Sequence, residues 1–418
     1  ALIFPPSAIS REREYIFAGT VQRTPSSLLV TLWSITATTA ITNTDNKISK
    51  ISKADLTGIL FFIFYLAILS KFFQSTIFKS LRGLNMELDI CSLGNAIVDV
   101  QFSITKEYEE ELNNLQIDRG SMTLVEQNQQ DSMIKDLVGL YERPLMACGG
   151  SAINSIVAAS NFGSKCHVAG KVSDDEQGNY FLEDLTNNVI DHSIIPAKSD
   201  ISTARCLVMV SKDAERTMCT YLGISNSLTE VDLNLEAISS AQYLFIEGYL
   251  LSSPSAFEAC KTAITVAKEN ETKVAISLSA EFIATSFKKE LENLFDLGCD
   301  LLVCNEAEAL AYSGESDIEQ AVQHLEETSE QVLITLGAEG CMGFSDQEAF
   351  LVEGLKVNAI DTNGAGDMFA GAVLHCLCEG LGLKKAAQFG CSAASKKVES
   401  FGPRLKKNEC KEIKKNYF

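Results

Sequence analysis

The chain has 418 residues, of which 46% are hydrophobic and 22% are charged, a composition typical of folded globular proteins. Its formal net charge of −20 argues against nucleic acid as a partner, because an acidic surface repels backbone phosphates. Thirteen cysteines without a Cys-x-x-Cys pair and only four histidines argue against a zinc site and a disulfide scaffold, so we expect a cytoplasmic protein.

The first 85 residues differ in character from the rest. They carry a net charge of +5, whereas residues 86–418 carry −25, and the first methionine is Met86. An apolar run at Gly58–Leu69 has 12 residues, whereas a membrane-spanning helix needs about 20. A signal anchor stays open as an alternative. We expect residues 1–85 to be an extension outside the fold, and residues 86–418 to form the functional domain without a membrane partner.

Before residue 230 the chain shows short elements separated by polar turns. The predicted elements are a strand at Asp89–Leu93, a helix over 106–116, a turn at Cys148–Gly150, a helix of small residues at Ser151–Ser160, a strand at His167–Gly170, and paired strands at Leu207–Val210 and Met218–Tyr221.

After residue 230 strands and helices alternate regularly. The predicted strands are Tyr243–Ile246, Val274–Ser277, Leu301–Cys304 and Val332–Leu336. The predicted helices cover residues 254–269, 281–294, 306–312 and 317–327. This alternation indicates a parallel sheet wrapped by helices.

The strongest chemical signal is the string from Asp361 to Asp367, Asp-Thr-Asn-Gly-Ala-Gly-Asp, followed by an apolar helix at Met368–Leu377. Two glycines before a helix let backbone N–H groups point into one space, and the helix N-terminus adds positive potential. The segment therefore predicts a site for charge on a transferred phosphate. Asp367 would take the proton of an attacking hydroxyl. The alternative, a simple helix N-cap, is disfavoured for the full seven-residue string.

A second signal is the string Gly149-Gly150-Ser151-Ala152-Ile153-Asn154-Ser155. Paired glycines allow a ligand to approach the backbone, and Asn154 offers both a donor and an acceptor one helical turn later. The alternative is a flexible turn before a core helix.

These two strings resemble the signatures of the PfkB family of carbohydrate kinases, and the similarity runs from about Leu88 to Arg404. The adenosine kinase branch is the most similar. The segments that suggest this branch are Gly94–Asp99, Gly149–Ser155, Asn363 and Gly402–Arg404. The resemblance implies a ribokinase-like, three-layer α/β/α fold with a small β-sheet lid built from residues 97–126 and 201–223.

The resemblance also implies roles for individual residues. The implied acceptor contacts are Asn95, Asp99, Gly149, Gly150 and Asn154, and the implied nucleotide contacts are Asn305, Thr335, Gly337 and Gly340. Glu308 would organise magnesium through water, and Arg216 in the lid would meet the transferred phosphate. Each position also has a plain structural interpretation: Asp99 as a polar strand end, Asn305–Glu308 as a helix start, Thr335–Gly340 as a strand-to-turn segment, and Arg216 as a solvated hairpin residue.

The implied reaction is attack of a substrate hydroxyl on the γ-phosphate of ATP, with Mg²⁺ bridging ATP oxygens. Asp367 would accept the proton, and the amides of Gly364, Ala365 and Gly366 would stabilise the transferring group. We expect a ribose-bearing nucleoside as acceptor, with adenosine first. A ribokinase- or fructokinase-like sugar kinase and a non-catalytic ligand-binding homologue stay open as alternatives. The protein would act on its small-molecule substrate as a monomer or homodimer.

Two departures from the family bear on the substrate and base contacts. Ser279-Ala280-Glu281 stands where related chains often have Asp-Pro. Cys391-Ser392 stands where we expect a larger or amide residue near the base of the nucleotide. Candidates for an apolar slot around the acceptor's base are Leu124, Val125, Met209 and Tyr221, which could equally form the core of the lid.

Overall fold

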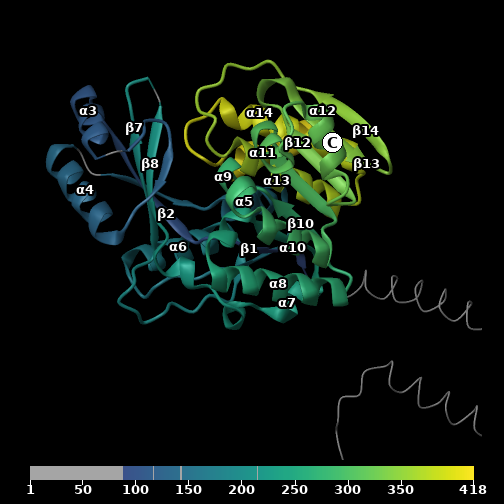
Figure 1. The fold of residues 1–418 in the computed structure, drawn as a ribbon, viewed down its shortest axis with the longest axis horizontal. Helices are drawn as coiled ribbons and strands as arrows, with labels where there is room; N and C mark the ends of the chain where they lie inside the picture. Colours follow the sequence, from purple (N-terminus) through teal and green to yellow (C-terminus); the bar gives the residue numbers. More distant parts are fainter. Residues whose placement is uncertain (1–87, 116, 142–143, 214) are drawn as a thin grey trace, which may run out of the picture. The chain divides into compact units, whose positions relative to one another are not determined.

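The computed structural model describes residues 88–115, 117–141, 144–213 and 215–418, so the expectation about residues 1–85 lies outside the described residues. Nine strands of this part form one sheet in the order β14-β13-β12-β11-β10-β9-β1-β5-β6 (Figure 1). They are β1 (Leu88–Leu93), β5 (Cys166–Ala169), β6 (Asp191–His192), β9 (Ala241–Glu247), β10 (Lys273–Ser277), β11 (Leu301–Asn305), β12 (Gln331–Thr335), β13 (Gly340–Ser345) and β14 (Glu348–Glu353). The strands from β12 to β6 run parallel, whereas β13 is antiparallel to both of its neighbours.

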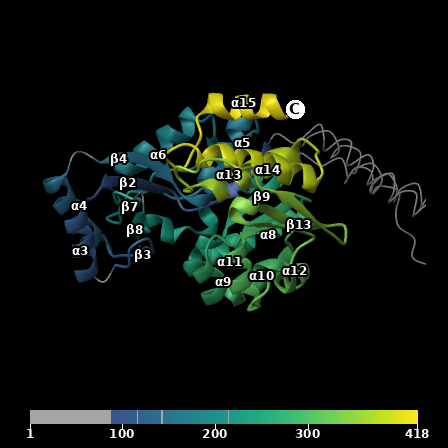
Figure 2. The same cartoon turned by 90° about the horizontal axis from the view of Figure 1, so that it is seen from above.

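Helices cover both faces of this large sheet, and the three layers are visible in Figure 2. One face carries α5 (Ser151–Phe162), α6 (Glu176–Asn187), α13 (Ala365–Cys378), α14 (Leu383–Val398) and α15 (Lys407–Tyr417). The other carries α7 (Leu235–Ser240), α8 (Pro254–Glu269), α9 (Glu281–Ser286), α10 (Lys288–Gly298), α11 (Glu306–Ser313) and α12 (Ile318–Leu325).

The cause of this layering is the alternation of side chains along each strand. Ile90 and Phe245 pack with the first group of helices, whereas Cys91 and Leu244 pack with the second. The predicted three-layer α/β/α fold is therefore confirmed. None of the helices in the described ranges is long and apolar enough to cross a lipid bilayer.

A second, five-stranded sheet has the order β3-β8-β7-β2-β4. Its strands are β2 (Ile97–Ser103), β3 (Met122–Leu124), β4 (Leu145–Gly149), β7 (Ala204–Val210) and β8 (Arg216–Tyr221). The helices α3 (Lys106–Asn114) and α4 (Gln127–Leu140) cover its outer face (Figure 1), where Phe102, Leu112, Leu137 and Met209 are buried together. The opposite face is left for the site described below.

Two local predictions were wrong. The predicted turn at Cys148–Gly150 is largely the end of strand β4, which pairs antiparallel with β2 so that Gly149 faces Ile97. Only the second glycine of the pair turns the chain, because Gly150 has a φ of 96°. The predicted helix over 281–294 is divided into α9 and α10 at Phe287, which has non-helical dihedral angles.

Candidate active site

Three of the polar residues predicted for the site follow or end strands of the large sheet. Asn95 comes just after β1, Asn305 ends β11 and Thr335 ends β12. Because neighbouring strands here are parallel, their carboxyl ends lie along one edge. In open α/β sheets, that edge is where ligands bind.

The Asp361–Asp367 string forms the entrance to helix α13. Gly364 precedes the helix with a φ of 75°, a left-handed conformation that glycine adopts without strain. A Cβ atom at this position would lie 2.2 Å from the carbonyl oxygen of Pro403. Glycine is therefore required both by the dihedral angle and by the closeness of the Pro403 segment.

Asp367 is the third residue of α13, not its N-cap, so the alternative interpretation of this residue is wrong. Its Oδ1 atom accepts a hydrogen bond of 2.6 Å from the Ser151 hydroxyl, and its Oδ2 atom accepts one of 2.9 Å from Asn154 Nδ2. Both partners lie on α5, where Gly149–Ser155 ends β4 and starts the helix. The two sequence signatures thus meet at one carboxylate.

The surroundings of Asp367 oppose its ionisation. Burial raises the pKa of Asp367, although the hydrogen bonds from Ser151 and Asn154 and the charge of Arg404 act in the opposite direction. This shift brings the pKa of the carboxyl group closer to the operating pH. Proton transfer by a general base is most efficient when the two are close.

The side chain of Asp99, on the inner face of β2, makes no hydrogen bond to another described residue. Gly149 leaves it room, because a Cβ atom on Gly149 would lie 2.6 Å from Asp99 Oδ1. Burial raises the pKa of Asp99 to about 6, against the charges of Arg404 and Arg216, which lower it. A desolvated carboxylate with free acceptor positions is suited to bind hydroxyl groups of a ligand.

Glu247, at the end of β9, was missed by the sequence analysis. It is fully buried and accepts three hydrogen bonds: from the backbone N–H and the Nδ2 of Asn95 at 2.7 and 2.8 Å, and from the N–H of Ala152 at 2.7 Å. Asn95 Oδ1 also accepts from the Ser225 hydroxyl. The side-chain amide of Asn95 therefore donates to Glu247 and accepts from Ser225. Glu247 links the residues that follow β1 to the start of α5.

We expect Glu247→Ala to lower the free energy of unfolding by roughly 3 kcal/mol or more, because three buried donors lose their acceptor at about 1–3 kcal/mol each. Glu247→Gln should lose less, since its amide oxygen can still accept from Asn95. Urea denaturation measures both. The control is Glu258→Ala, whose exposed carboxylate pairs with Lys261 and should change stability by under about 0.5 kcal/mol. Equal losses at positions 247 and 258 would contradict the assignment.

Asn305 and Glu308 form a reciprocal cap at the start of α11. Asn305 Oδ1 accepts from the Glu308 N–H, while the Glu308 carboxylate accepts from the backbone N–H and Nδ2 of Asn305. Burial raises the pKa of Glu308 to about 7. Within the described residues no group of three or more His, Cys, Asp or Glu side chains is placed to hold a metal ion. Direct coordination by a cluster of protein ligands is thus not supported in this part of the chain, whereas contact through water fits a single buried carboxylate.

Two cavities lie at the carboxyl edge of the large sheet. The smaller, of about 300 Å³, is bordered by several predicted residues: Asn95, Asp99, Gly150, Asn154, Gly364, Ala365, Gly366 and Asp367. The larger, of about 870 Å³, is bordered by Thr335, Gly337 and Gly340 together with residues of α13 and α14. Both volumes fall in the range of small-molecule sites. The cavities share Thr362, Ala365 and Gly366 as lining residues, so the loop before α13 forms a common wall.

The small sheet supplies an apolar wall to the smaller cavity. Of the four candidates for a base slot, Leu124 lines the cavity, whereas Val125 and Met209 are buried in the core of the small sheet and Tyr221 packs against that core. The side chains of Met209 and Tyr221 lie on the face of the small sheet that points away from the cavity. Successive side chains of a strand point to opposite sides, and Cys206, Met218 and Thr220 are the ones that border the cavity. Two aromatic residues that were not predicted, Tyr249 and Phe282, also stand in the cavity wall, with their ring centroids 6.1 Å apart.

Arg216, at the start of β8, is not the solvated residue of the alternative interpretation. Its side chain is 12% exposed and its Nη2 atom lies 2.5 Å from Asp361 Oδ2. The guanidinium also lies over the ring of Phe401, 5.1 Å from its centroid. The ion pair links the small sheet to the first residue of the loop before α13.

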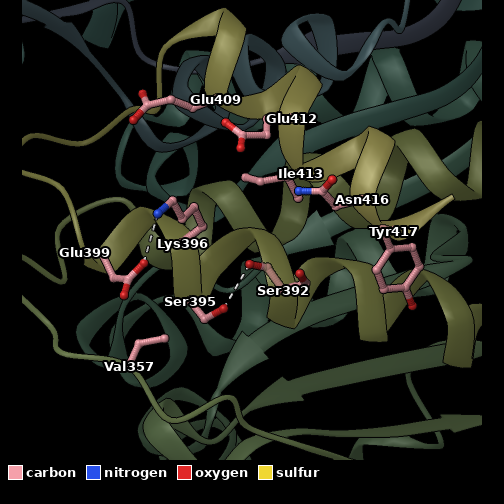
Figure 3. A pocket seen from close by; sticks show the side chains of 10 residues that line it. All are labelled: Val357, Ser392, Ser395, Lys396, Glu399, Glu409, Glu412, Ile413, Asn416 and Tyr417. Carbon is pink, nitrogen blue, oxygen red and sulfur yellow. Dashed lines mark hydrogen bonds and ion pairs between the residues drawn. The ribbon is translucent and has the colours of Figure 1, made fainter.

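A third hollow lies between α14 and α15 (Figure 3). It shares Val357 and Ser395 with the larger cavity, and its wall includes the ion pair between Lys396 and Glu399 at 3.2 Å. None of the residues predicted for catalysis or binding borders it. The predicted site residues that line a cavity therefore border the other two.

The chain resembles known proteins over most of its described length. A family model described as pfkB family carbohydrate kinase matches residues 120–410. Fructokinase-2 of Solanum habrochaites is 29% identical over 274 residues, which cover 62% of this chain and 84% of that protein. The structure matches a probable sugar kinase from Rhizobium etli with a TM-score of 0.73 and 27% identity, over 79% and 99% of the two chains. It matches an adenosine kinase from Sinorhizobium meliloti with a TM-score of 0.71 and 28% identity, over 76% and 96%.

Proposed function

The chain belongs to the pfkB family of carbohydrate kinases, and on that premise we propose that it transfers the γ-phosphate of ATP to a hydroxyl of a ribose-bearing nucleoside, with adenosine as the preferred acceptor. Membership makes it an ATP-dependent kinase for sugars or nucleosides. The observation that carries the proposal is the meeting of two cavities at the loop before α13, with Asp367 bordering the smaller one.

In this proposal the acceptor occupies the smaller cavity. Asp367 takes the proton from its attacking hydroxyl. The backbone amides of Gly364, Ala365 and Gly366, at the positive end of α13, stabilise the charge that develops on the transferring phosphoryl group. Arg216, on the small sheet, exchanges its ion pair with Asp361 for the transferring phosphoryl group and so adds a positive charge beside it.

ATP occupies the larger cavity, with Thr335, Gly337 and Gly340 in its wall. Asn305 pairs with Thr335 on the neighbouring strand and holds Glu308 by hydrogen bonds, although neither Asn305 nor Glu308 borders the two cavities. Glu308 would hold Mg²⁺ through water, which suits its single buried carboxylate. When bound, the ion would neutralise phosphate charge. The small sheet acts as a lid, formed from residues 97–126 and 201–223 with β4 added, and excludes water from the acceptor during transfer.

The preference for a nucleoside rests on apolar and aromatic residues in the wall of the smaller cavity. A free sugar needs hydrogen-bonding groups around its hydroxyls, whereas an adenine ring needs apolar and aromatic surface. Tyr249, Phe282, Leu124 and Met218 provide such surface in the smaller cavity. Relatives named for either substrate are about equally similar to this chain, so a sugar kinase remains the second candidate. A non-catalytic role is disfavoured because Asp367 and its partners are all present.

A comparison of acceptors tests the proposal. Purified full-length protein would be assayed with ATP, Mg²⁺ and each of adenosine, inosine, ribose and fructose. We expect kcat/KM for adenosine to exceed that for ribose by more than about 100-fold, because reading the base requires roughly 3 kcal/mol of additional transition-state binding.

The control is Phe282→Ala, which should reduce kcat/KM for adenosine while leaving that for ribose within about twofold. Equal or better use of ribose or fructose would replace the nucleoside proposal by the sugar-kinase alternative. Absence of turnover with every acceptor tested would argue for a different substrate or for the non-catalytic alternative.

A further inference from the structure

Arg404 lies between helices α14 and α15. Its side chain reaches back to Asn154, a partner of Asp367. Its Nε atom donates a hydrogen bond of 2.7 Å to Asn154 Oδ1, and its Nη1 atom lies 2.6 Å from Asp184 Oδ2 on α6. Asn154 in turn donates through Nδ2 to Asp367. The Arg404 side chain is 15% exposed and does not border the smaller cavity. Arg404 is thus one residue removed from Asp367, held by a carboxylate on its far side.

The chemistry of the guanidinium determines which way the Asn154 amide faces. An arginine N–H can only donate, so the atom of Asn154 that faces it must be the oxygen. The Asn154 NH₂ group is then directed at Asp367, where it can donate to the carboxylate. Without Arg404 the amide could rotate and present its oxygen to Asp367, which would repel the ionised base.

The segment around Arg404 is braced against the loop before α13. The Gly402 N–H donates to Asp361 Oδ2 at 2.8 Å, and the Pro403 carbonyl lies against the Cα of Gly364. The approach of Arg404 to Asn154 is therefore tied to the same loop that carries the proposed phosphate site.

We propose that Arg404 is a positioning residue for Asp367, which fixes the Asn154 amide and supplies the positive charge that keeps the base ionised. This inference rests on the proposed function, in which Asp367 is the proton acceptor. Other charged or titratable groups also act on Asp367: Lys397 on α14, Asp99 on β2, Glu247 on β9, Tyr249 after β9 and Glu308 on α11. Asp99, Glu247 and Glu308 oppose ionisation of Asp367 when they are ionised, whereas Arg404 and Lys397 favour it together with the hydrogen bonds from Ser151 and Asn154.

The test is the pH dependence of kcat for full-length protein carrying Arg404→Met. We expect kcat to fall by about 10- to 100-fold, because the base loses its alignment. The acid limb of the profile should move to higher pH by about one unit, because removing a nearby positive charge raises the carboxyl pKa. The KM for ATP should stay within about twofold of the wild-type value. Arg404→Lys keeps the charge but cannot bridge both partners, so its kcat should fall while its acid limb stays near the wild-type position.

Asp184→Asn separates positioning from simple anchoring. It removes the ion pair to α6 but leaves the Arg404–Asn154 hydrogen bond, so kcat and the acid limb should remain close to wild type. The proposal is overturned if folded Arg404→Met keeps the wild-type acid limb, or if Asp184→Asn lowers kcat as much as Arg404→Met. A wild-type protein without kinase activity would overturn the proposed function itself, and this inference with it. An active wild type with an unaffected Arg404→Met would overturn this inference alone.

Discussion

Asp367→Asn should lower kcat by about 10²- to 10⁴-fold, the usual contribution of a general base. Asparagine has nearly the same size and can keep a hydrogen bond to Asn154 or Ser151, but its amide cannot accept a proton from the acceptor hydroxyl. The larger cavity should be unaffected, so ATP should bind with the wild-type Kd. Steady-state kinetics and a nucleotide-binding titration measure the two quantities separately.

The pH profile of the wild-type protein adds to this test. Because burial raises the pKa of Asp367, the base is protonated at a higher pH than an exposed aspartate. Turnover should therefore fall as the pH decreases through this raised pKa. Asp317→Asn is the matched control, since Asp317 caps α12 through the Gln320 N–H and lies outside both cavities. Near-wild-type turnover of Asp367→Asn, or an equal loss in Asp317→Asn, would remove Asp367 from the mechanism.

The residues that were predicted from sequence stand in short contiguous strings. Gly364 and Gly150 have positive φ angles, which restrict these positions to glycine and give the strings a pattern of their own. Asn305 and Thr335 were named from the family resemblance, and the structure places them at the ends of the parallel strands β11 and β12. Local patterns of this kind locate a site because each follows from backbone geometry within a few residues.

The contacts that were missed join residues far apart in the chain. Glu247 is a single acid at the end of an apolar strand, and its partners Asn95 and Ala152 lie 152 and 95 residues away. Arg404 and Asn154 are separated by 250 residues. No spacing in the sequence reports such pairs, because they arise only when β1, β9 and α5 are packed together.

Of the four candidates for the base slot, which were also predicted as possible lid core, only Leu124 borders the cavity, and the cause is different. The strands around Met209 and Tyr221 were found, but not the face that each side chain takes. Both faces of β7 and β8 carry apolar residues, because one packs on α3 and α4 and the other on a cavity. An amphipathic strand reveals its buried face, whereas a strand that is apolar on both sides does not.

Asp99→Ala should lower kcat/KM for the acceptor by about 10²- to 10⁴-fold. A hydrogen bond to a charged group contributes about 1.5–3 kcal/mol, and a carboxylate that accepts from two neighbouring hydroxyls would lose two of them. Each 1.36 kcal/mol corresponds to about a factor of ten in rate. The KM for ATP should remain within about twofold, because Asp99 borders only the smaller of the two cavities. Asp213→Ala is the control, since this exposed carboxylate in the turn between β7 and β8 pairs with Arg119.

The ionisation of Asp99 makes the test sharper. Its pKa is raised to about 6 by burial, and only the ionised form accepts hydrogen bonds from both hydroxyls with full strength. For wild-type protein, kcat/KM for the acceptor should therefore decrease as the pH falls through about 6. Asp99→Asn cannot ionise, so its kcat/KM should be low at every pH and should lack this decrease, apart from the one due to Asp367. If Asp99→Asn and the wild type show the same profile and the same kcat/KM for adenosine, Asp99 does not bind the acceptor.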